Sequence, residues 1–131
     1  MSQIYANADD FEVLFTQMFD RIESEDSAAM DELVEQEMVV RFRLRGPDVE
    51  LWVDGRSHPV SASFGAQDLD ASFTASMSTN DMHDLLLGKL GLAKALLFRK
   101  VKVQGSQSKA MKLESLLHAM QAVYPAMAAG L

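Results

Sequence analysis

Three histidines and several carboxylates are the side chains in this sequence whose types could support acid–base or metal chemistry. His58, His83 and His118 lie far apart along the chain, and their separations match no metal-ligand spacing. His83 and His118 are expected on helices, as solvated surface residues. The acidic pair Asp9-Asp10 and the acidic residues 23–26 are expected at a helix start and in a loop, where carboxylates serve structure. The chain has no cysteine and therefore no thiolate. We predict no catalytic residue, no metal site and no cofactor.

Two further patterns that could suggest chemistry are better interpreted as structural. Gly88-Lys89 lacks the upstream glycine of a phosphate-binding loop, and it is predicted to end a helix. No serine stands in the G-x-S-x-G pattern of hydrolases. The hydroxyl side chains that alternate with apolar residues are expected to face solvent from a sheet: Ser61, Ser63, Ser72, Thr74 and Ser76.

The segment from Leu85 to Phe98 is the most unusual part of the chain, because nearly all of it is apolar. A helix with one buried stripe would have polar residues at about half of these positions. The segment must therefore touch apolar matter on two sides. One side can be a sheet, and the other must be a further helix, a partner or an apolar ligand.

Length, charge and termini restrict the class of protein. The 131 residues predict a single domain, residues 1–131, with one ordinary core. The formal net charge of −7 argues against nonspecific binding to nucleic acid or to a strongly anionic membrane, although a local patch could still bind either. We find no signal-peptide pattern and no apolar run of membrane-spanning length. A cytoplasmic protein is therefore expected.

Helical periodicity precedes and follows a block with period two. Apolar residues from Phe11 to Ile22 recur at helical spacing, and Asn7 can cap that helix. A shorter helix is expected over 28–37, and a long one over 107–124, ending before Pro125. Ser78 to Asp81 fits a capping box that opens another helix.

Alternating apolar and polar residues predict strands at 40–45, 49–53, 60–64 and 71–77, with a fifth at 100–105. We expect the first four to form an antiparallel meander with one wet face, and all helices to cover the other face in an α+β fold. Arg41, Arg43 and Arg45 form a basic stripe on the outer face. It is either a solvated strand or a docking surface for anionic headgroups or an acidic partner.

Two segments give this sequence a specific resemblance: FTASMSTNDMHDLLLGKL and KVKVQGSQSKAMKLESLL. They resemble the sterol carrier protein family, or nonspecific lipid-transfer proteins, as does Trp52 in the second strand. The resemblance implies a five-stranded, mainly antiparallel sheet with helices on one face. It also implies an apolar cavity for a fatty acyl chain, a sterol or a similar lipid. Arg99 departs from the family, which usually has glycine there, and Gly91-Leu92 stand where a proline is often found.

Residue sizes agree with a cavity, although a filled core remains an alternative. Ala62, Ala71 and Ala75 are small residues expected on the inner face. Met77, Met82, Met111 and Met120 suit a wall that adapts to varied guests. The predicted ligand-binding residues are Phe73, Met77, Leu85, Leu86, Leu90, Leu96, Leu97, Phe98, Met111 and Leu117.

The sequence therefore predicts a noncatalytic lipid-binding or lipid-carrier protein whose partner is a small hydrophobic molecule. Transient membrane contact and a homodimer are both compatible with it, and no nucleic-acid partner is expected. One alternative is an interaction or dimerisation module that accompanies a lipid-metabolising enzyme. A second is a small enzyme with a hydrophobic substrate, which would need an acid or base in the pocket.

Overall fold

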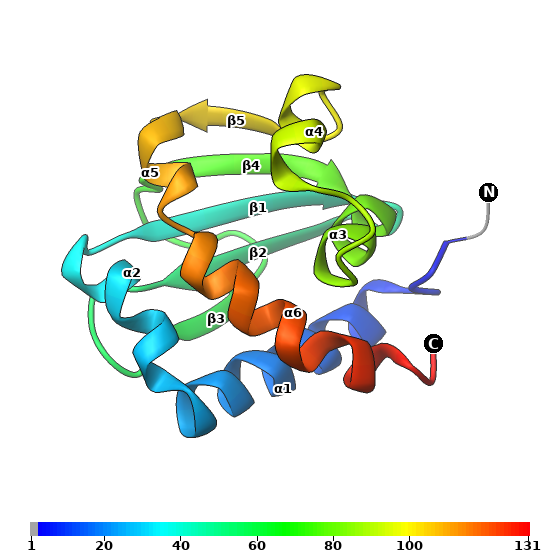
Figure 1. The fold of residues 1–131 in the computed structure, drawn as a ribbon, viewed down its shortest axis with the longest axis horizontal. Helices are drawn as coiled ribbons and strands as arrows, with labels where there is room; N and C mark the ends of the chain where they lie inside the picture. Colours follow the sequence, from blue (N-terminus) through cyan, green and yellow to red (C-terminus); the bar gives the residue numbers. More distant parts are fainter. Residues whose placement is uncertain (1–2) are drawn as a thin grey trace.

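A five-stranded sheet forms one layer of the protein (Figure 1), whose computed structural model describes residues 3–131. The order across the sheet is β3-β2-β1-β4-β5, and every neighbouring pair is antiparallel except the parallel pair β1–β4. The strands are β1 (Val39–Arg45), β2 (Val49–Asp54), β3 (Ser61–Phe64), β4 (Phe73–Ser78) and β5 (Lys102–Gly105).

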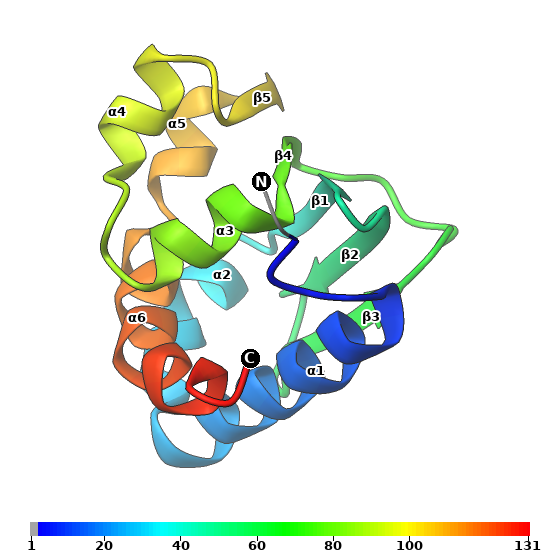
Figure 2. The same ribbon diagram turned by 90° about the vertical axis from the view of Figure 1, so that its right-hand side faces the viewer.

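The helices form the second layer, on one side of the sheet (Figure 2). They are α1 (Ala8–Glu25), the 3₁₀ turn η1 (Ser27–Met30), α2 (Asp31–Glu35), α3 (Thr79–Leu86), α4 (Leu92–Leu97), α5 (Gln107–Met111) and α6 (Glu114–Ala128). α1 packs against both β3 and α6, and α5 lies against β4 and β5. The predicted α+β class with a mainly antiparallel sheet is confirmed.

The predicted four-stranded meander is wrong, because β4 lies beside β1 and not beside β3. Thr74 of β4 pairs with Arg41 of β1, and the two strands run in the same direction. Residues 65–72 connect β3 to β4, and eight extended residues can span about 26 Å, enough to cross two strands. Alternation shows which face a side chain takes but not which strand is its neighbour, so the sequence pattern could not distinguish the two orders.

The outer face of the sheet is less exposed to solvent than predicted. Trp52 and Thr74 are both buried there. The guanidinium of Arg41 lies 5.4 Å from the centre of the Trp52 ring, and its Nε donates to Thr74 Oγ1 at 3.1 Å. Arg41 therefore has a structural role, whereas Arg43 and Arg45 are exposed.

The first helix begins and packs as its sequence predicts, but it continues to Glu25. Residues 23–25, which were expected in a loop, are therefore helical. Asn7 Oδ1 accepts a hydrogen bond from the amide of Asp10 at 2.9 Å, which satisfies one free donor of the first turn. The buried residues are those of the predicted apolar stripe: Phe11, Leu14, Phe15, Met18, Phe19 and Ile22. The ring centres of Phe11 and Phe15 lie 3.9 Å apart in a stacked pair.

The predicted helix over 107–124 is two helices, and the second continues past its proline. α5 ends at Met111, and α6 starts at Glu114 and runs through Pro125 to Ala128. The break lets α5 cover β4 and β5 while α6 turns toward α1 (Figure 1). Pro125 removes one amide donor near the end of the helix, and buried Tyr124 and Ala128 keep the last turn packed.

The apolar segment from Leu85 to Phe98 is divided between two short helices. Ser78 Oγ accepts from the amide of Asp81 at 3.0 Å and caps α3, as predicted. Gly88, at a φ of +77°, ends α3. After α4, Arg99 takes the same left-handed conformation, with a φ of +58°, although it has a side chain.

We expect Arg99→Gly to raise the free energy of unfolding by about 0.5 kcal/mol. The left-handed conformation costs a residue with a Cβ roughly 1–2 kcal/mol, and the larger chain entropy of glycine offsets part of the gain. Gly88→Ala is the reciprocal control and should lower stability by about 1 kcal/mol, since open space surrounds its Cβ position and only the backbone is affected. Urea unfolding measures both. Changes of the same sign would contradict this explanation.

Candidate functional site: an apolar pocket between sheet and helices

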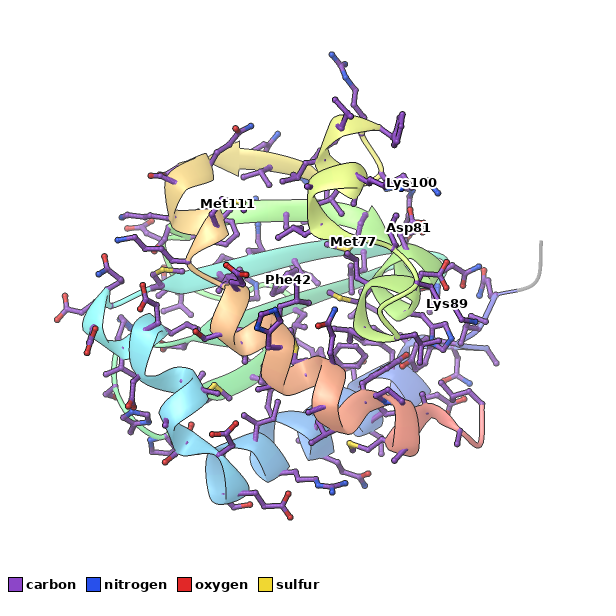
Figure 3. All side chains as sticks on the ribbon, viewed as in Figure 1. Phe42, Met77, Asp81, Lys89, Lys100 and Met111 are labelled. Carbon is purple, nitrogen blue, oxygen red and sulfur yellow. The ribbon has the colours of Figure 1, made fainter. Side chains whose placement is uncertain are left out.

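An apolar pocket lies between the inner face of the sheet and the helices α3 to α6. Figure 3 shows Phe42 and Met77 on the sheet and Met111 on α5. All fifteen lining residues are apolar: Phe42, Phe73, Ala75, Met77, Met82, Leu85, Leu92, Leu96, Val101, Val103, Ala110, Met111, Leu113, Leu117 and Met120. The pocket therefore offers no side-chain hydrogen bond to a guest.

The pocket exists because small residues stand where the helices could otherwise meet bulky ones. Ala75 in β4 has Phe42 of β1 on one side and Val103 of β5 on the other. Across the pocket, Ala110 is the buried residue of α5. A methyl group at each of these positions leaves volume that the larger neighbours do not fill.

The space available depends on how far the methionine side chains move. The pocket has a cavity volume of about 60 Å³. One buried water needs about 10–15 Å³, so the interior is larger than a single-water void. A long hydrocarbon chain would require Met77, Met82, Met111 and Met120 to change rotamer, which methionine does readily.

Of the ten residues predicted to bind ligand, six line this pocket: Phe73, Met77, Leu85, Leu96, Met111 and Leu117. The other four lie elsewhere. Leu86 is fully buried in the core, Leu90 is half-buried in the loop after α3, and Leu97 and Phe98 are exposed. Leu92, Ala95 and Leu96 share the inner side of α4 at helical spacing, which turns Leu97 and Phe98 outward.

Several lining residues were missing from the predicted set, including Phe42, Ala75 and Val103. The period of two in the strands was a sufficient signal, since it places all three on the inner face. Met82 and Met120 were predicted as parts of an adaptable wall, and both contact the pocket. Ala110 and Leu113 also had a signal, because both stand at helical spacing from Leu117, which was in the predicted set.

A second feature, a buried chain of three polar groups, joins the N-terminal segment to α3 and α6. The hydroxyls of Tyr5 and Tyr124 lie 2.6 Å apart, and Tyr124 Oη lies 2.7 Å from His83 Nδ1. Both tyrosines are fully buried, and burial raises the pKa of Tyr124 to about 12. The prediction that His83 is a solvated surface residue is wrong, because its ring is half-buried against Tyr124.

The neutral form of His83 is the one that fits this chain. Its Nδ1 then accepts from the Tyr124 hydroxyl, whose oxygen accepts from the Tyr5 hydroxyl, so each donor has an acceptor. Desolvation lowers the pKa of His83, whereas the hydrogen bond to Glu23 raises the pKa of His58. The pKa of His83 should therefore lie below the ordinary histidine value of 6.5, and the pKa of His58 should lie above it.

We expect an NMR titration of the imidazole protons to give a pKa below 6.5 for His83 and a pKa above 6.5 for His58. Since the unfolded chain protonates His83 before the folded chain does, its contribution to stability is complete above the unfolded pKa and falls as the pH drops below it. His58 acts oppositely, so its contribution is complete below its unfolded pKa and is lost as the pH rises through its folded pKa. His83→Asn and His58→Asn assign the resonances. A His83 pKa above that of His58 would contradict this.

Among residues 3–131 there is no cluster of three or more histidines, cysteines or carboxylates that could hold a metal ion. No helix in the same range is long and apolar enough to cross a bilayer. The site is thus an apolar pocket in a two-layer domain with helices over one side of the sheet.

Fold and pocket together define a class: an α+β domain with an apolar interior between one sheet and its helix layer. The chain belongs to the SCP-2 sterol transfer family, whose sequence profile matches residues 15–118. The predicted resemblance to sterol carrier proteins is confirmed.

Two solved structures and one curated relative illustrate this relationship. The fold is similar to sterol carrier protein domain 2 of Helicoverpa armigera, with a TM-score of 0.67, 20% identity, and coverage of 86% of this chain and 87% of that one. It is also similar to apo sterol carrier protein 2 of Yarrowia lipolytica, with a TM-score of 0.65, 18% identity, and coverage of 82% and 89%. Hydroxysteroid dehydrogenase-like protein 2 of Bos taurus is 32% identical over 96 residues, which are 72% of this chain and 23% of that protein. The chain thus spans about a quarter of this relative.

Proposed function

We propose that this domain is a noncatalytic carrier that holds a fatty acyl chain, a sterol or a similar lipid in the apolar pocket. The observation that supports this most is the composition of the lining, which is entirely apolar and includes four methionines. Such a surface selects for hydrophobicity and shape and not for a particular headgroup. Membership of the SCP-2 sterol transfer family supports the same proposal. The cytoplasm is the proposed location.

The energy of transfer is sufficient for this function. Each buried methylene contributes about 0.8 kcal/mol, so a chain of about 14 methylenes gains roughly 11 kcal/mol before costs. Association and ordering remove several kcal/mol of this, which leaves at most about 8 kcal/mol and a dissociation constant of about a micromolar or weaker. No polar recognition is required, and broad specificity follows.

A chain-length series tests this proposal. Saturated fatty acids of increasing length compete with a fluorescent fatty-acid analogue for the purified protein. We expect affinity to rise about fourfold for each added methylene until the pocket is filled, and then to level off. Affinity that does not depend on chain length, or the absence of displacement, would count against a hydrocarbon pocket.

The alternative of a small enzyme receives no support from the described pocket. An enzyme acting on a bound lipid would need an acid or base beside the reacting atoms. On α3, the titratable residues Asp81, His83 and Asp84 are next to Met82 or Leu85 in the sequence, but none of the three lines the pocket.

An interaction module remains the second candidate, because Leu97 and Phe98 at the end of α4 are exposed. Apolar side chains exposed to solvent on a protein surface often mark a contact site. If two copies met through this surface, the mass measured by light scattering would be twice 14.5 kDa and would fall to the monomer value with Leu97→Ser. The charges around these residues disfavour such a dimer and favour a different partner.

A further inference from the structure

The charged residues of this chain are distributed very unevenly. Residues 85–113 contain seven of the twelve lysines and arginines and no aspartate or glutamate. Residues 9–37 contain eleven acidic residues and a single basic one, Arg21. A chain with a net charge of −7 therefore has one strongly basic segment and one strongly acidic segment.

The fold places these two segments at opposite ends of the molecule. Figures 1 and 2 both show α4, β5 and α5 together at one end and α1 at the other. All seven basic side chains of residues 85–113 are exposed. None of them forms an ion pair with any residue from 3 to 131. The positive charge of this end is therefore not neutralised within the described chain.

The same end carries the two most exposed large apolar side chains among residues 3–131, Leu97 and Phe98, and a third that is half exposed, Met111. Leu97 is 74% exposed, Phe98 66% and Met111 49%. In sequence, Leu97 and Phe98 lie between Lys94 and the pair Arg99-Lys100. Protruding apolar side chains surrounded by cations suit the interface of a bilayer, where the apolar groups enter the acyl boundary and the cations remain at the phosphates.

We propose that the end formed by α4, β5 and α5 docks on a bilayer containing anionic phospholipid, with Leu97 and Phe98 inserted at the acyl boundary. Charge complementarity supports this occupant, because each basic residue near an anionic surface contributes attraction within about a Debye length. The acidic α1 end is repelled by the same surface, so the electrostatic field of the protein also sets its orientation.

A bilayer fits this surface better than a second copy or another protein does. Two copies that met here would bring like charges together. An acidic protein partner would need a surface complementary to Leu97 and Phe98, whereas a fluid bilayer accepts protruding side chains of any shape. Docking would also bring the pocket close to lipid, because Leu92 and Leu96 on the inner side of α4 line it.

Vesicle co-sedimentation tests this proposal without any added fatty acid, so its outcome is independent of the proposed cargo. The probes are vesicles of phosphatidylcholine alone and vesicles of phosphatidylcholine mixed with phosphatidylglycerol. We expect binding to the mixed vesicles only, weakened by salt. Lys94→Glu with Lys100→Glu, or Leu97→Ser with Phe98→Ser, should each lower the partition coefficient at least about tenfold. These side chains are exposed, and circular dichroism checks that each variant is folded.

Matched variants elsewhere decide which surface is responsible. Arg43→Glu with Arg45→Glu makes the same charge change on the outer face of the sheet, and Val13→Ser removes a side chain that is 58% exposed on α1. Both should leave binding unchanged. Loss of binding in either control, equal binding to both kinds of vesicle, or no binding to either would overturn the proposal.

A fluorescence measurement separates insertion from simple adsorption. In a Trp52→Phe background, Phe98→Trp and Val13→Trp each give a protein with one tryptophan. We expect mixed vesicles to shift the emission of the Phe98→Trp protein to shorter wavelength and to leave that of the Val13→Trp protein unchanged. A shift confined to the Val13→Trp protein, or no shift in either, would contradict insertion at α4.

Discussion

Replacing Ala75 with leucine is expected to weaken fatty-acid binding at least about tenfold while leaving the protein folded. Ala75 stands at the centre of the pocket floor, between Phe42 and Val103. The added side chain would occupy space that the ligand needs, and displacing two methylenes removes about 1.6 kcal/mol of binding energy. Since the added side chain enters the pocket and displaces no packed neighbour, it should not lower the free energy of unfolding. Competition binding and urea unfolding measure the two effects.

Ala119→Leu is the matched control for this experiment. Ala119 is also a buried alanine, but it does not line the pocket. Overfilling a packed region costs about 1–3 kcal/mol, so this variant should lose stability and keep its affinity for fatty acid. If Ala75→Leu instead lost stability to the same degree and bound ligand normally, the region around Ala75 would be a filled core.

Replacing Tyr124 with phenylalanine is expected to lower the free energy of unfolding by about 2 kcal/mol, more than Tyr5→Phe does. Tyr124 is the middle of the buried chain, and it contacts both Tyr5 and His83. Without its oxygen, the buried hydroxyl of Tyr5 has no acceptor, and such a group costs about 1–3 kcal/mol. In Tyr5→Phe, the Tyr124 hydroxyl still donates to His83, so only one hydrogen bond of about 1 kcal/mol is lost.

The double variant makes this argument more specific. Tyr5→Phe combined with Tyr124→Phe removes the unpaired hydroxyl, so it should be more stable than Tyr124→Phe alone. Urea unfolding of the wild-type protein and the three variants completes the cycle. A double variant whose loss of stability equals the sum of the two single losses would show that the hydroxyls do not act as a chain.

The parts of this fold that the sequence predicted are those with a long, regular pattern. α1 has a cap and six buried residues at helical spacing, and its start and buried side follow from these alone. The strands alternate clearly enough to assign their inner residues. The position of β4 beside β1 was not predictable in this way, because alternation is the same for either neighbour and the connection 65–72 permits both.

The candidate site was predicted only in part because its helices are short. α4 has six residues, fewer than two turns, so composition alone did not show that Leu96 faces the pocket while Leu97 faces solvent. His83 was interpreted as a surface residue because its partner, Tyr124, lies 41 residues away in the sequence. Such a hydrogen bond depends on how α3 and α6 are packed, which no local pattern reveals.

Methionine methyl NMR is the most direct test of the central claim, because the pocket is lined by Met77, Met82, Met111 and Met120. Met18, Met30 and Met38 are fully buried outside the lining and serve as internal controls. We expect a long-chain fatty acid to shift the four methyl signals of the pocket and leave those of the three controls in place. Shifts at Met18, Met30 and Met38 with none at the pocket methionines would show that lipid binds elsewhere.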